Sequence, residues 1–183
     1  MKQKSILLVA ILALVTFFMS SHASSAKDDF AVGSTLDNFK LSDTNGKEQS
    51  LNDLKGKNGA ILVFLSVQCP VVKGYDERIV KLAADYKAKG INVIGINSNA
   101  TEALDKVKTH AAANYKFPVL IDKNNVLADK FGATVTPEIF YFNGKNVTTD
   151  YLRTALTESL SGKAIAKNTA NAFGCSIKRV EKQ

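Results

Sequence analysis

The chain has 183 residues, of which 45% are hydrophobic and 22% are charged, and its formal net charge is +7. This length and composition fit one domain with one hydrophobic core. The lysines are spread along the whole chain, so the mild positive charge indicates a solvated surface and argues against a nucleic-acid-binding protein.

The first 26 residues have the pattern of a secretory signal peptide. Two lysines precede an apolar run over residues 6–19, and small residues follow as far as Ala23 and Ala26. The alternative is a membrane anchor, but the run is shorter than the roughly 20 residues that a bilayer span needs. We therefore expect cleavage after Ala23 or Ala26 and a secreted or periplasmic protein that keeps no membrane anchor.

Alternating polar and apolar residues over 39–42 and 47–51 flank the turn signal Asn45-Gly46 and predict a β-hairpin. Residues 60–66 are apolar on both faces, which is typical of a central strand in a covered sheet. From residue 70 the period changes to that of a helix, which ends near Lys89 before Gly90 and places Tyr75 in the core.

The rest of the chain alternates strands and helices. Strands are predicted over 91–97, 119–121 and 138–142, and helices over 101–114, 124–131 and 149–160. Asn99 or Thr101 is expected to cap the helix over 101–114. The alternation predicts a largely parallel sheet with helices on both faces, in a domain spanning residues 27–178 and followed by a short tail, 179–183.

Cys69 follows the predicted central strand and precedes Pro70, so it lies where a helix begins. Unpaired N–H groups and the positive end of the helix dipole stabilise a thiolate there, and Lys73 would add a positive field one turn later. The alternative is a buried, inert cysteine. The carboxyl end of a central strand favours a functional site.

Cys175 is the second of the two cysteines. It is a resolving thiol for an oxidised Cys69, the partner of Cys69 in a permanent structural disulfide, or an unpaired tail cysteine. No CxxC pair is present, and His110 is the one histidine outside the signal sequence, so neither a structural zinc site nor any other metal or cofactor is expected. His110 has no acidic residue near it on its alanine-rich helix, which predicts a surface histidine.

Five segments together resemble the peroxiredoxin-like redoxins of the alkyl hydroperoxide reductase/thiol-specific antioxidant family. The segments are 64–75, 95–99, 117–122, 135–138 and 174–178. The resemblance spans about residues 32–178 in the order and spacing of that family. It implies a thioredoxin-like α/β fold, with a central mixed sheet flanked by helices on both faces.

The resemblance also implies roles for individual residues. Cys69 matches the reactive cysteine of the family, and Thr136-Pro137 matches the cis-proline that packs beside it and offers backbone groups to a disulfide-bearing partner. Ser66 matches either the hydroxyl that binds peroxide in peroxiredoxins or the first cysteine of a CxxC pair, lost here. It is otherwise a serine that simply ends a strand.

The chain departs from the peroxiredoxin pattern in three places. Leu62 stands where that pattern has a proline, and Pro137 stands near the position of an arginine that polarises the peroxide. Arg78 is a substitute for that arginine or a solvated charge. Asn143-Gly144 runs almost directly into the last helix, which predicts a shortened sheet edge where relatives have another strand.

These observations predict an exported, thiol-dependent oxidoreductase with an antioxidant or disulfide-exchange activity. Its expected partners are a peroxide or a protein disulfide as substrate and an external thiol as reductant, with Cys69, Cys175, Ser66 and Pro137 at the site. The alternative is a non-catalytic thioredoxin-fold module that holds an extended partner beside Pro137.

Overall fold

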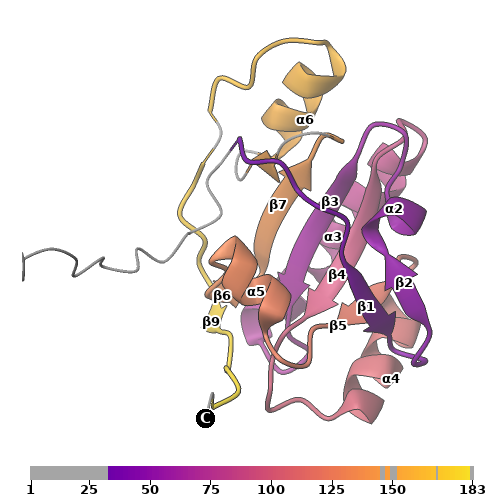
Figure 1. Cartoon of the computed structure of the whole chain (residues 1–183), viewed down its shortest axis with the longest axis vertical. Coiled ribbons are helices and arrows are strands. Elements are labelled where there is room, and N and C mark those ends of the chain that lie inside the picture. The colour runs from indigo at the N-terminus through magenta and orange to yellow at the C-terminus, as the bar shows by residue number, and fades with distance from the viewer. Residues whose placement is uncertain (1–32, 145–146, 149–151, 168, 182–183) are drawn as a thin grey trace, which may run out of the picture.

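The computed structural model describes residues 33–144, 147–148, 152–167 and 169–181 (Figure 1). A mixed sheet forms its centre and helices cover both faces of the sheet. The helices are α2 (Leu51–Leu54), α3 (Pro70–Lys87), α4 (Leu104–Asn114), α5 (Val126–Phe131) and α6 (Leu152–Leu160). The strands are β1 (Lys40–Asp43), β2 (Glu48–Ser50), β3 (Ala60–Leu65), β4 (Asn92–Asn97), β5 (Val119–Ile121), β6 (Val135–Thr136), β7 (Glu138–Phe142), β8 (Val147–Thr148) and β9 (Cys175–Ser176).

Seven of these strands form the main sheet in the order β2-β1-β5-β4-β3-β7-β8. β3, β4 and β5 run parallel, and β1 and β7 pair antiparallel with β5 and β3. The parallel strands need crossover helices, which accounts for the strand and helix alternation in the sequence. The mixed sheet with helices on both faces that the resemblance implied is confirmed, and so are the hairpin and the strands over 119–121 and 138–142. The largely parallel sheet predicted from the alternation is wrong, because β1–β2, β1–β5, β3–β7 and β7–β8 pair antiparallel.

β3 lies inside the sheet between β4 and β7, and all six of its residues are buried. Leu62 and Phe64 pack on the face covered by α5, where the Phe64 ring contacts those of Phe131 and Phe140 at centroid distances of 5.8 and 5.6 Å. Ile61 and Val63 point to the opposite face, which α3 and α6 cover. Burial on both faces fixes the end of β3, and therefore the start of α3, relative to the rest of the sheet.

Two sequence predictions about the helices are wrong. Tyr75 is 42% exposed, because Val72 takes the inward position in the first turns of α3, and the guanidinium of Arg78 lies 5.1 Å from the Tyr75 ring centroid. α4 begins at Leu104 and is capped by Ala103, which makes no side-chain hydrogen bond to it. Asn99 does not cap α4, because its side chain is engaged with Ser66, Glu102 and the backbone of Lys178.

β8 pairs with β7 at the end of the described sheet, and because residues 145–146 and 149–151 on either side of it lie outside the described residues, the shortened edge stays a prediction. The first 26 residues, predicted to be a signal peptide, and residues 149–151 of the last predicted helix lie outside the described residues. Across the ranges that the structure describes, no helix is long and apolar enough to cross a membrane.

Candidate active site

Cys69 and Cys175 form a disulfide with a Cα–Cα distance of 5.9 Å, although 106 positions separate them in the chain. Cys69 occupies the N-cap position of α3, directly after the turn that follows β3, and Pro70 occupies the first turn of the helix. Pro70 costs the helix nothing there because the first-turn N–H groups have no partner within the helix. The disulfide excludes the unpaired tail cysteine among the alternatives for Cys175.

A two-stranded ladder brings Cys175 to Cys69. β9 pairs antiparallel with β6, with Thr136 opposite Cys175 and Val135 opposite Ser176. The sulfur of Cys69 lies 3.3 Å from the carbonyl oxygen of Thr136, and the Thr136 hydroxyl donates to the carbonyl of Cys175 at 3.4 Å. The Thr136–Pro137 peptide bond is cis, as the family resemblance implies.

The two sulfur-bearing residues differ in exposure. Cys69 is 2% exposed and belongs to a buried cluster formed by α3, α4 and the end of β3, whereas Cys175 packs against that cluster and is half-buried. The first turn of an 18-residue helix lies at Cys69. Its dipole and its free N–H groups favour a thiolate at Cys69 over one at Cys175.

Glu102 holds the loop that leads into Cys69. Its carboxylate accepts hydrogen bonds from the Ser66 hydroxyl, the backbone N–H groups of Val67 (3.2 Å) and Gln68 (2.9 Å), and the side-chain amide of Asn97 (2.5 Å). A fifth donor, the amide of Asn99, lies at 3.3 Å. Sequence reasoning missed Glu102, because its partners lie on β4 and on the loop after β3 and share no spacing with it.

These hydrogen bonds determine the protonation state of Glu102. Partial burial acts to raise the pKa of this carboxyl, but the bonds from Ser66, Asn97 and the two backbone N–H groups outweigh burial and lower it. Glu102 is therefore a carboxylate at neutral pH. The hydroxyl of Ser66, which is 3% exposed, donates a hydrogen bond to this carboxylate.

His110 is not the isolated surface histidine that the sequence predicted. Its Nε2 lies 3.3 Å from a carboxylate oxygen of Asp76, on the neighbouring helix α3, and both side chains are less than 20% exposed. The hydroxyl of Tyr115 donates to the other oxygen of Asp76. Burial, followed by this bond to Asp76, raises the pKa of Tyr115 strongly. The sequence could not reveal this cluster, because the packing of α4 against α3 creates it.

Two side chains that the sequence analysis considered for peroxide binding, those of Ser66 and Arg78, are engaged with other residues. The Ser66 hydroxyl is bonded to Glu102, and Arg78 stacks on Tyr75 more than two helical turns from Cys69. Arg179, the other arginine whose side chain is described, pairs with Asp129 at 3.1 Å.

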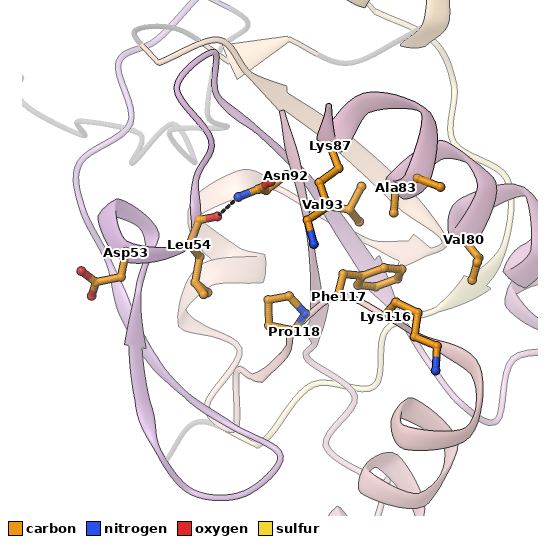
Figure 2. Close-up of a pocket in the computed structure, with 11 residues that line it drawn as sticks. Asp53, Leu54, Val80, Ala83, Lys87, Asn92, Val93, Lys116, Phe117 and Pro118 are labelled. Carbon is orange, nitrogen blue, oxygen red and sulfur yellow. Dashed lines mark hydrogen bonds between the residues drawn. The ribbon is translucent and has the colours of Figure 1, made fainter. Parts of the chain in front are cut away.

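A pocket of about 410 Å³ lies elsewhere, between the middle of α3, the start of β4 and residues 116–118 (Figure 2). Asn92 donates to the carbonyl of Leu54 at its edge, at 2.8 Å. Neither cysteine lines this pocket. Among the described residues no group of three or more histidine, cysteine or acidic side chains is placed to hold a metal ion.

The fold and the site together define a thioredoxin-like protein with a cysteine pair beside a cis-proline. The chain belongs to the AhpC/TSA family, whose model matches residues 32–153, and it is an oxidoreductase. It is 28% identical over 158 residues to the thiol-disulfide oxidoreductase ResA of Bacillus subtilis, an alignment that covers 85% of each chain.

Solved structures agree on the fold. An uncharacterized conserved protein from Geobacillus kaustophilus superposes with a TM-score of 0.77 at 27% identity, covering 85% of this chain and 96% of that one. The thioredoxin domain of a thiol-disulfide oxidoreductase from Bacteroides vulgatus superposes with a TM-score of 0.56 at 22% identity, covering 66% and 88%. The thioredoxin-like fold that the sequence predicted is therefore confirmed.

Proposed function

We propose that the protein is an exported thiol–disulfide oxidoreductase that cycles Cys69 and Cys175 between a disulfide and a dithiol. The observation that carries this proposal is the Cys69–Cys175 disulfide at the N-terminus of α3, next to cis-Pro137. A resolving role for Cys175 is favoured over a permanent structural link, because a helix terminus stabilises one of the two thiolates and because the relative from Bacillus subtilis is a thiol-disulfide oxidoreductase.

Reduction of the protein begins at the more exposed sulfur. The thiolate of an external reductant attacks the sulfur of Cys175, the bond between Cys175 and Cys69 breaks, and Cys69 leaves as the thiolate. The N-terminus of α3 stabilises a thiolate that departs from Cys69, which favours this direction of attack. A second reductant thiolate then attacks the reductant sulfur of this mixed disulfide and releases Cys175 as a thiolate. The two reductant sulfurs leave joined by a disulfide bond.

The reduced protein passes its electrons to a substrate disulfide. The Cys69 thiolate attacks one substrate sulfur, forms a mixed disulfide and displaces the other substrate sulfur as a thiolate. Cys175 then attacks Cys69, restores the internal disulfide and releases the second substrate thiol. This cycle reduces one disulfide of the substrate and needs neither a metal nor a cofactor.

Peroxide reduction is the alternative reaction of Cys69, and one feature of the site disfavours it. The Ser66 hydroxyl, the group that would bind a peroxide, donates its proton to Glu102. A non-catalytic module that grips a partner beside Pro137 is also disfavoured, because β9 fills that position in the oxidised chain. Export rests on the predicted signal sequence over residues 1–26.

The test is disulfide reduction of insulin driven by dithiothreitol, with the full chain and its Cys69→Ser and Cys175→Ser variants. We expect the wild type to accelerate the reaction, Cys69→Ser to abolish the acceleration, and Cys175→Ser to accumulate a mixed disulfide visible by mass. An acceleration that survives in Cys69→Ser would refute the proposal. Loss of the Cys69 thiolate to hydrogen peroxide much faster than loss of a free thiol would favour the peroxidase.

A further inference from the structure

β9 lies on β6 in the way that a bound peptide strand lies on a sheet edge. Within the described part of the chain β6 has no other strand partner, and its two residues adjoin Cys69 through the carbonyl of Thr136. If β9 lifts, the backbone of Thr136 loses its strand partner next to the reactive sulfur, while the N–H of Val135 stays bonded to Glu138. A free strand edge is a ready template for an extended segment of another polypeptide.

Gly174, directly before Cys175, fits this position for a steric reason. A Cβ atom on Gly174 would lie 1.9 Å from the carbonyl oxygen of Thr136 and 2.6 Å from its carbonyl carbon. Both atoms belong to the backbone of a residue that is 1% exposed, so neither can move aside. No residue with a side chain fits before the cysteine in this register.

The chain on the two sides of β9 is held very differently. Downstream, the N–H of Ile177 donates to the carbonyl of Thr134 (2.9 Å), Ile177 is 7% exposed, and Lys178 exchanges two hydrogen bonds with residues 99–100. Upstream, residues 169–173 are exposed, and Phe173 is 83% exposed. Once the disulfide opens, β9 can therefore peel away from its upstream side while the anchor beyond it stays in place.

We propose, on the basis of the function proposed above, that β9 occupies the position on β6 where an extended segment of the substrate polypeptide binds. The natural partner is then a polypeptide with an extended segment in which glycine directly precedes the disulfide-bonded cysteine. A mixed disulfide joins the partner's sulfur to that of Cys69, as the internal disulfide now joins that of Cys175. Pairing with β6 in the register of β9 then puts the preceding partner residue against Thr136, at the place of Gly174.

The experiment uses the Cys175→Ser full chain, in which Cys69 is the only thiol. Two peptides are compared, one with the sequence of residues 171–178 and one with alanine in place of its glycine, each carrying thionitrobenzoate on the cysteine. The Cys69 thiolate attacks the peptide sulfur, the Cys69–peptide bond forms, and thionitrobenzoate leaves with the electron pair of the broken bond. Its absorbance gives the rate, and the rate of each peptide with glutathione corrects for intrinsic reactivity.

We expect the glycine peptide to react about tenfold faster than the alanine peptide, a difference of about 1.4 kcal/mol. We also expect Gly174→Ala, added to Cys175→Ser, to raise the rate with the glycine peptide severalfold, because the chain's own strand no longer fits beside Thr136. Gly74→Ala is the matched control, since a Cβ built there meets nothing within 4 Å apart from its chain neighbours and the backbone of its own helix, and it should leave the rate unchanged.

Equal corrected rates for the two peptides would overturn this inference and leave the proposed function intact. A thiol titration of the unfolded Cys175→Ser chain shows whether Cys69 is a free thiol. If it is free and neither peptide reacts with the folded chain, the proposed function fails as well. Should the Gly174→Ala double variant not fold, the comparison of the two peptides on Cys175→Ser alone still decides.

Discussion

Replacing Glu102 by glutamine tests whether this residue holds the loop before Cys69. In the native chain one carboxylate oxygen accepts from Ser66, Gln68 and Asn99, and the other accepts from Val67 and Asn97. A glutamine amide has a single acceptor oxygen, and its NH₂ group is a donor. Whichever way the amide turns, at least two of the five donors lose their acceptor.

The magnitude follows from those two lost bonds. A buried donor without an acceptor costs about 1–3 kcal/mol, and partial access of water to Glu102 argues for the lower figure, about 2 kcal/mol in total. For a domain of this size that loss lowers Tm by about 4–8 °C. Glu77→Gln is the matched control, because Glu77 is exposed on α3, and it should change Tm little.

The effect of Glu102→Gln should depend on pH in a defined direction. Because the pKa of Glu102 is lowered in the folded protein, the carboxylate contributes its full stability above the usual pKa of a glutamate. That contribution is lost as the pH falls through the lowered pKa. Urea unfolding of both proteins at a series of pH values should therefore show a difference that is constant near neutrality and shrinks in acid. A difference that is absent at pH 7, or that does not change with pH, would refute the reasoning.

Three further predictions concern other parts of the fold. Tyr115→Phe should lower the unfolding free energy by about 1–2 kcal/mol in urea titrations, because Asp76 loses its hydroxyl donor. Since the pKa of Tyr115 is raised, the wild type should also lose stability as the pH rises above about 10, and the variant should lose less. Reducing the Cys69–Cys175 disulfide should lower the unfolding free energy by up to about 4–5 kcal/mol, the chain entropy of a loop of about 100 residues. Phe64→Ala should cost about 3–5 kcal/mol by the same titration, because Phe64 is fully buried against Phe131 and Phe140.

The elements with strong local patterns could be predicted from the sequence. β3 is a continuous apolar run because both of its faces are covered, and α3 is marked at one end by Pro70 and at the other by Gly90. Those two elements fix Cys69 at the carboxyl end of a central strand, so the principal site residue could be found without the structure.

The parts of the site that depend on packing could not be predicted in this way. β6 and β9 have two residues each, too few for a periodic pattern, so the sequence left open whether Cys175 reaches Cys69. Glu102 and the pair of Asp76 and His110 come together only when helices and loops distant in sequence pack. The cap of α4 was mispredicted for the same reason, since Asn99 has partners in the tail and near the site.

The most direct test of the proposed redox cycle is the midpoint reduction potential of the Cys69–Cys175 pair in the full chain. It would be measured in dithiothreitol and glutathione buffers of graded potential, with alkylation and mass detection of the thiols. A redox-active pair should titrate as a two-electron couple above about −300 mV, in the range of disulfide oxidoreductases. A midpoint below about −300 mV, where structural disulfides of secreted proteins lie, would show that the bond is a permanent link and contradict the proposed cycle.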